Sequence, residues 1–181
     1  MVDRSAVNMN QTISQTDLCF VALGSNLGDS RLIIRQAMER LQSFSDRPLL
    51  RSSLWQTTPV DCPPGSPIFI NAAVGLVARA DETPETMLAK LQALEREFGR
   101  APKTTLHEPR PLDLDLIAFG KQRRNTPDLT LPHPRAHQRR FVLQPMAEIA
   151  PDFVIPGQSE TIAVLLIRLT SPETVVRLSE F

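Results

Sequence analysis

The spacing of hydrophobic residues along the chain predicts a domain that mixes strands and helices. Residues 18–25, LCFVALGS, form a nearly continuous apolar run, which is typical of a central strand. The polar turn GSNLGDS ends this run, and a helix is predicted after it from apolar residues at helical spacing: Ile33, Ala37, Leu41 and Phe44. Residues 49–56 and 68–80 predict two further strands, joined by the proline-rich loop TTPVDCPPGSP.

A second helix is marked by residues that favour helix ends. Thr83 followed by Pro84 is a helix start, and Gly99 is a helix end, so residues 84–98 are predicted to be helical. The elements predicted after it are a strand from residue 112, helices near 141–149 and 161–169, and a short strand at 174–178. The order β-α-β-β-α-β of the first six elements indicates an α+β protein with a ferredoxin-like sheet.

The strand that begins at residue 112 carries two aspartates that folding alone does not explain. Leu112, Leu114 and Leu116 alternate with Asp113 and Asp115, so the aspartates share one face, which is also expected to carry Ile117 and Phe119. Their side chains start about 6.6 Å apart and repel by about 2 to 3 kcal/mol at an effective dielectric near 20. A magnesium ion would relieve this repulsion. The alternative, a solvated face of an edge strand, stays open for a bare Asp-x-Asp.

Length and charge narrow the class of protein. The chain has 181 residues with 20 basic and 20 acidic side chains, so it has no general attraction to nucleic acid or acidic membranes. We expect a disordered extension over residues 1–16 and a single domain over 17–181. No apolar run approaches the ~18 residues of a membrane span, and the N-terminus lacks the apolar core of a signal peptide, so a cytoplasmic protein is predicted. Cys19 and Cys62 lack metal-type spacing, and Cys19 is expected to be a packing residue.

Other polar residues gain meaning around the predicted acidic strand. Asn71 interrupts an apolar strand beside Phe69, a pairing that would suit a flat heterocycle; an edge-strand asparagine bonded to backbone is the alternative. Gln92 and Glu95 flank the apolar stripe of the second helix, where an ordinary boundary pair is the alternative. Basic residues before and after the strand suit a polyphosphate, or are simply solvated charges: Arg100, Lys103, Arg110, His133, Arg135, Arg139 and Arg140.

Four motifs in this order resemble the 6-hydroxymethyl-7,8-dihydropterin pyrophosphokinases of folate biosynthesis. They are VALGSNLGD, QTTPVDCPPGSPIFINAAV, PRPLDLDLIAFG and LPHPRAHQRRFVLQPMAEIAPDF, and the resemblance runs from about residue 18 to 157. It implies a ferredoxin-like α/β/α sandwich with a mainly antiparallel sheet. It also implies transfer of pyrophosphate from ATP to the hydroxymethyl oxygen of the pterin, with release of AMP. A noncatalytic nucleotide-binding or regulatory module of the same fold is the alternative function.

The resemblance also implies roles for particular residues. Asp113 and Asp115 would hold two Mg²⁺ ions, and with Arg100 and Arg110 they would form the catalytic set. The implied pterin-binding residues are Thr58, Pro59, Phe69, Asn71 and Phe141. The implied ATP-binding residues are Gln92, Glu95, Arg110, His133 and Arg139, while Arg100 resembles a basic residue of a closing loop. In that loop the chain departs from the common pattern at Pro102, Leu106, His107 and Glu108. We expect a monomer.

Overall fold

The computed structural model describes residues 18–60, 65–101 and 108–179. Several predictions lie outside these ranges: the extension at residues 1–16 and the positions Cys62, Pro102, Lys103, Leu106 and His107. The assignment of residues 17–181 to one domain stays a prediction.

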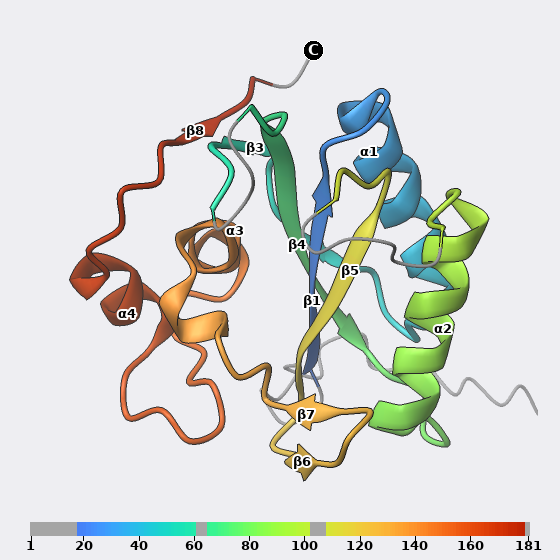
Figure 1. The fold of residues 1–181 in the computed structure, drawn as a ribbon. Coiled ribbons are helices and arrows are strands. Elements are labelled where there is room, and N and C mark those ends of the chain that lie inside the picture. Colours follow the sequence, from blue (N-terminus) through green and yellow to red (C-terminus); the bar gives the residue numbers. More distant parts are fainter. Residues whose placement is uncertain (1–17, 61–64, 102–107, 180–181) are drawn as a thin grey trace, which may run out of the picture.

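The centre of the protein is an antiparallel sheet with strand order β5-β1-β4-β3-β8, in which β2 also pairs with β4 (Figure 1). Its strands are β1 (Leu18–Ser25), β2 (Leu50–Arg51), β3 (Trp55–Thr57), β4 (Phe69–Val77), β5 (Asp113–Phe119) and β8 (Val175–Arg177). With β2 and β3 counted as one interrupted strand, the first four strands follow the predicted ferredoxin-like order. The predicted ferredoxin-like α+β fold is confirmed.

The strand predicted over residues 49–56 is wrong in one respect, because it is broken into β2 and β3. At the break, the side chain of Ser52 accepts a hydrogen bond from Ala73 N at 2.8 Å, and Ser53 N donates to the Glu148 carboxylate at 2.9 Å. Side chains therefore satisfy backbone groups that a continuous ladder would have paired.

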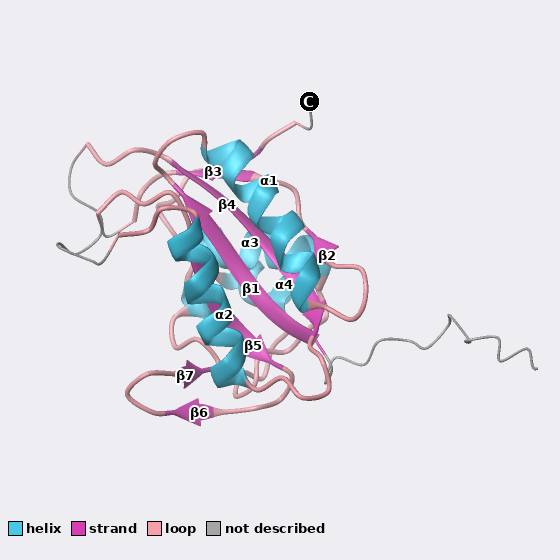
Figure 2. Ribbon diagram, turned by 90° about the vertical axis from the view of Figure 1, so that its right-hand side faces the viewer, coloured by secondary structure: helices cyan, strands magenta, loops and turns pink. Residues whose placement is uncertain are grey.

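Two helices cover each face of the sheet (Figures 1 and 2). They are α1 (Ser30–Leu41) and α2 (Pro84–Glu97) on one face, and α3 (Arg140–Ile149) and α4 (Ile162–Arg168) on the other. Each pair buries its own hydrophobic cluster against the sheet, so the α/β/α sandwich is confirmed. Helix α2 begins as predicted, with the Thr83 hydroxyl accepting from Thr86 N, and Gly99 follows it at φ +88°.

The segment between β5 and α3 contains elements that were not predicted. It forms a small hairpin, β6 (Arg124–Asn125) with β7 (Thr130–Leu131), and a 3-10 helix at Ala136–Gln138. Another 3-10 turn, Gln42–Phe44, follows α1. Among the described residues, no helix is long and apolar enough to cross a membrane.

Strand β5 keeps its leucines and aspartates on opposite faces as predicted, but Phe119 is not on the aspartate face. The pairing of β1 with β5 shifts register between Phe20 and Val21, which adds one residue to β5. Ile117 therefore packs with the α3 and α4 cluster on the aspartate side, whereas Phe119 packs in the α1 and α2 cluster with the leucines.

Candidate active site

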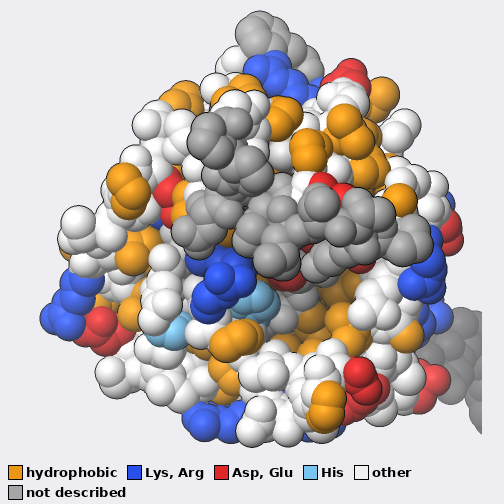
Figure 3. Space-filling view, in the orientation of Figure 1, with side chains coloured by type: hydrophobic (Ala, Val, Ile, Leu, Met, Phe, Trp, Pro, Cys, Tyr) orange, Lys and Arg blue, Asp and Glu red, His pale blue; other side chains and the backbone are white. Residues whose placement is uncertain are grey.

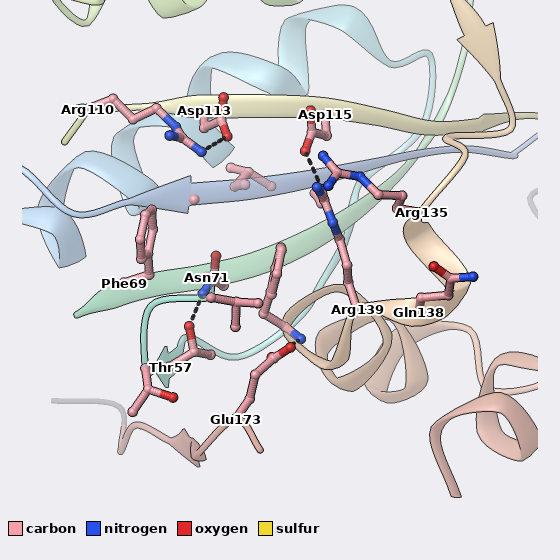
Figure 4. Close-up of a pocket in the computed structure, with 16 residues that line it drawn as sticks. Thr57, Phe69, Asn71, Arg110, Asp113, Asp115, Arg135, Gln138, Arg139 and Glu173 are labelled. Carbon is pink, nitrogen blue, oxygen red and sulfur yellow. Dashed lines mark hydrogen bonds and ion pairs between the residues drawn. The ribbon is translucent and has the colours of Figure 1, made fainter. Parts of the chain in front are cut away.

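A cavity of about 200 Å³ lies where β1, β4 and β5 meet the start of α3 and the segment that leads into β8 (Figure 4). Its lining residues are Ala22, Leu23, Gly24, Thr57, Thr58, Val60, Phe69, Asn71, Arg110, Asp113, Asp115, Arg135, Gln138, Arg139, Phe141 and Glu173. Figure 3 shows basic side chains and a histidine beside hydrophobic side chains near the middle of the face seen in Figure 1.

The structure brings most of the residues singled out from the sequence to this one cavity. Those that line it are Thr58, Phe69, Asn71, Arg110, Asp113, Asp115, Arg139 and Phe141. Three other predicted residues do not line the cavity but act on the acidic strand. Arg100 pairs with Asp113, Glu95 accepts a hydrogen bond from Leu114 N, and the charge of His133 acts on Asp115. Pro59 is half-buried next to Thr58, and Gln92 is exposed on α2.

Asp113 is held by two arginines. Its carboxylate lies 2.7 Å from an Arg100 nitrogen and 2.6 Å from an Arg110 nitrogen, and the Asp113 side chain is only 18% exposed. Arg100 also pairs with Glu95, whose carboxylate accepts a hydrogen bond from Leu114 N at 2.7 Å. Burial raises the pKa of Glu95 to about 7. Arg100 thus links Glu95, near the end of α2, to Asp113, the first residue of β5.

Asp115 is less tightly paired. The nearest arginine nitrogen, on Arg139, lies 3.7 Å from its carboxylate, and its side chain is 36% exposed. Burial within the cavity wall, and then the charge of Asp113, raise the pKa of Asp115. Burial lowers the pKa of the neighbouring His133, whose backbone N–H donates to Ile117 O at 2.9 Å.

These contacts correct the view of an uncompensated carboxylate pair. β5 is an edge strand, but its aspartates face arginines and a cavity instead of open solvent. The repulsion estimated from their spacing is real, yet arginines from outside the strand oppose it.

The residue types still fit a divalent cation. Two carboxylates from one rigid strand open into the same cavity, and Mg²⁺ commonly uses one or two carboxylates with water and phosphate oxygens completing its shell. The raised pKa of Asp115 marks a place where added positive charge is favoured. Within the described ranges, no group of three or more His, Cys, Asp and Glu side chains is arranged to hold a metal, so substrate or water would supply the other ligands.

Two aromatic rings stand at the sides of the cavity, each next to an arginine that pairs with an aspartate. The Arg110 guanidinium lies 5.6 Å from the centre of the Phe69 ring, and that of Arg139 lies 5.4 Å from the centre of the Phe141 ring. Figure 4 shows Arg110 directed toward Asp113 and Arg139 toward Asp115. The aromatic and acidic parts of the cavity therefore share the same two cations.

Asn71 is buried in the central strand β4, at 5% exposure, and is not the edge-strand residue of the alternative interpretation. Its amide nitrogen donates to the Thr57 hydroxyl at 2.7 Å, which fixes the orientation of the amide. A Cβ placed on Gly24 would lie 3.1 Å from the Asn71 oxygen and 3.9 Å from Phe69. Glycine at this position keeps the space beside the amide open.

Sequence reasoning missed several lining residues. Thr58 was singled out but Thr57 was not, although Thr57 lies opposite Phe69 in the pairing of β3 with β4 and so shares a face of the sheet with Asn71, its diagonal neighbour. Gln138 lies within the motif LPHPRAHQRR but carries no charge to mark it. Glu173 had no local signal, because only the return of the C-terminal segment to the sheet brings it to the cavity.

The family model for 7,8-dihydro-6-hydroxymethylpterin-pyrophosphokinase (HPPK) matches residues 20–151. The chain belongs to this family. Among its relatives, the 2-amino-4-hydroxy-6-hydroxymethyldihydropteridine pyrophosphokinase of Porphyromonas gingivalis is 36% identical over 137 residues, covering 74% of this chain and 91% of the relative. The protein of that name from a Synechocystis species is 38% identical over 146 residues, covering 81% and 73%. The resemblance read from the four motifs is confirmed, including its assignment to an enzyme family.

Solved structures agree on the fold. The chain matches wild-type Plasmodium falciparum HPPK-DHPS, crystallised with SDX-DHP, with a TM-score of 0.64 and 12% identity over 83% of this chain. It matches an HPPK-DHPS solved in complex with substrates with a TM-score of 0.62. The chain spans less than half the length of these proteins, 44% and 42%, so the match concerns their HPPK-like fold alone.

Proposed function

We propose that the protein transfers the pyrophosphoryl group of ATP to the hydroxymethyl group of 6-hydroxymethyl-7,8-dihydropterin, with release of AMP, as a step of folate biosynthesis. The observation that carries the proposal is a single cavity with an aromatic and amide part next to an acidic and basic part. The aromatic and amide part suits a flat heterocycle with a reactive side group, and the acidic and basic part suits a polyphosphate. Transfer of a group from one ligand to the other requires the two parts to lie side by side.

The pterin is proposed to bind between Phe69 and Phe141, with Asn71 at its ring edge. A pterin ring carries several hydrogen-bonding groups, and a buried amide held in one orientation can pair with them selectively. Thr58 and Pro59 would line the side of this pterin-binding site, which we call the ring seat. The faces of the two rings would supply apolar contact area.

ATP is proposed to bind on the side of β5. Its phosphates would meet Arg110, Arg139 and Arg100, with Gln92, Glu95 and His133 placed along the route from α2 to the segment before α3. Asp113 and Asp115 would hold two Mg²⁺ ions. When bound there, Mg²⁺ would neutralise phosphate oxygens and lower the pKa of an oxygen that it ligates.

The chain itself contributes mainly positioning and charge. Phosphoryl transfer depends on alignment of the attacking and leaving oxygens and on cations around the transferred group, and arginines serve this purpose well. Arg110 and Arg139 already lie between the rings and the aspartates, where they could turn to phosphate oxygens without a change of backbone. The Asp113 and Asp115 carboxylates are the bases on the phosphate side of the lining that could accept the hydroxyl proton. We also propose that the enzyme acts as a monomer in the cytoplasm.

The deciding experiment mixes the protein with Mg²⁺, ATP and reduced hydroxymethylpterin, and separates the nucleotides by chromatography. AMP should appear in equal amount to pyrophosphorylated pterin, and neither should form when the pterin is omitted or EDTA is added. Formation of ADP would indicate an ordinary kinase. Tight ATP binding with no turnover would instead favour a noncatalytic nucleotide-binding module.

A further inference from the structure

The segment that leads into β8 contacts one wall of the cavity through the start of helix α3. The helix is preceded by Arg139, which gives no side-chain cap to the first backbone N–H groups. Glu173 takes that place instead, because its carboxylate accepts a hydrogen bond from Phe141 N at 3.1 Å (Figure 4). Unpaired N–H groups at a helix start attract a carboxylate both by hydrogen bonding and by the helix dipole.

The next residue of the same segment contacts the opposite wall. Thr174 N donates to the Thr58 hydroxyl at 3.1 Å, and Thr58 N donates to Thr174 O at 3.2 Å. The pairing of β8 with β3 continues this contact, with Val175 opposite Thr57. Residues 173–175, which we name the C-terminal brace, therefore tie the helix that carries Phe141 to the strand and loop that carry Thr57 and Thr58.

Neighbouring contacts hold the C-terminal brace in place from both sides. Before it, the Arg140 guanidinium donates to Leu169 O at 2.8 Å. After it, Arg177 donates to the Ser53 hydroxyl and to the Glu148 carboxylate, the latter at 3.0 Å. These contacts hold Glu173 in the cavity lining. Glu173 lies outside residues 20–151, which match the family model.

We propose that Glu173 is a positioning residue for the pterin: by capping α3 it fixes Phe141 as one wall of the ring seat. This inference rests on the proposed function, since it assumes that the ring between Phe69 and Phe141 is a pterin. Without the cap, the first turn of α3 would lose the carboxylate that orders Phe141 N, and the Phe141 ring would lose its fixed place. Among the described residues, no hydrogen bond or ion pair joins Glu173 to Asp113, so binding on the Asp113 side of the cavity should change much less than binding of the pterin.

The test compares Glu173→Ala, Glu173→Gln and Thr161→Ala by steady-state kinetics with each substrate varied in turn. Glu173→Ala should raise the KM for the pterin by about fivefold, the effect of losing a helix cap, while the KM for ATP stays within about twofold. Glu173→Gln keeps an acceptor for Phe141 N and should recover most of the loss. Thr161→Ala is the matched control, because Thr161 caps α4 by accepting from Val164 N and lies outside the cavity lining.

Three results would overturn the proposal: an unchanged pterin KM in Glu173→Ala, equal effects of the Ala and Gln substitutions, or an equal effect of Thr161→Ala. Failure of the proposed function is recognised separately, because the unmodified protein would then release no AMP. The hydrogen bond from Phe141 N to Glu173 can also be tested without substrates, by NMR. The NMR signal of the Phe141 amide should shift strongly in Glu173→Ala and little in Glu173→Gln, and an unmoved signal in both would refute the cap itself.

Discussion

Replacing Asp113 by asparagine should destabilise the metal-free protein, whereas the same substitution at Asp115 should not. Asp113 meets Arg100 at 2.7 Å and Arg110 at 2.6 Å, and these three side chains are between 16% and 23% exposed. With charge centres near 4 Å and an effective dielectric near 20, each pair attracts by about 4 kcal/mol, against about 2 to 3 kcal/mol of repulsion from Asp115. The attractions therefore outweigh the repulsion.

Only part of this gross attraction counts toward stability. Desolvation offsets much of it, and removal of one partner from a buried ion pair typically costs about 3 to 5 kcal/mol. Here the groups are partly exposed and Arg100 keeps its contact with Glu95, so we expect Asp113→Asn to cost about 2 kcal/mol. Within the part of the chain that the structure describes, Asp115 has one ion pair, the longer one with Arg139, and its side chain is 36% exposed. Burial and the charge of Asp113 disfavour the Asp115 carboxylate, and Arg139 favours it, so Asp115→Asn should leave stability unchanged or raise it by about 0.5 kcal/mol.

The assay is urea unfolding of both variants and the unmodified protein at pH 7.5 with EDTA, followed by thermal melts. For a chain of this size, a loss of about 2 kcal/mol corresponds to a fall in Tm of roughly 4 to 8 °C. Asp113→Asn should show this fall, and Asp115→Asn should melt near the unmodified protein. If Asp113→Asn is as stable as the unmodified protein, the reasoning is refuted. The attraction of the two arginines to Asp113 would then not exceed its repulsion by Asp115.

Two further predictions concern other residues of the site. Asn71→Ala should weaken pterin binding by more than tenfold and leave nucleotide binding nearly unchanged, because unpaired ring groups cost about 1 to 3 kcal/mol each; equal losses of both ligands in calorimetry would contradict this. Glu95 has a folded-state pKa of about 7, above its usual 4.5, so the native state holds the proton more tightly and stability is lost as pH rises from about 4.5 to 7. The loss should be roughly 3 kcal/mol in the unmodified protein and much smaller in Glu95→Gln, as measured by urea unfolding at pH 4.5 and 8; equal losses in the two proteins would refute the assignment.

Local signals in the sequence were sufficient for much of the fold. The ends of α2 could be predicted because Thr83, Pro84 and Gly99 each favour one backbone conformation at a helix end, whatever surrounds them. The alternation along β5 likewise follows from strand geometry alone. The break between β2 and β3 could not be read in this way, because it depends on a side chain of the distant helix α3, Glu148, that pairs with Ser53 N.

The same distinction separates what was predictable in the site from what was not. Spacing along one strand places Asp113 and Asp115 on a common face, but it gives no information about what lies across from them. The arginines that meet them come from the end of α2, from the loop before β5 and from the start of α3. A repulsion estimate that treats the strand alone therefore has the wrong sign for Asp113 in the folded protein.

The shared arginines also connect the two parts of the cavity. Arg110 contacts both Phe69 and Asp113, and Arg139 lies between Phe141 and Asp115. A guanidinium drawn toward phosphate oxygens must weaken its attraction to the aspartate, and its position over the aromatic ring changes with it. A phosphate-bearing ligand on one side therefore alters the wall of the ring seat on the other. If the proposed substrates bind here, nucleotide and pterin affinities are expected to be coupled through these two side chains, with no movement of the sheet required.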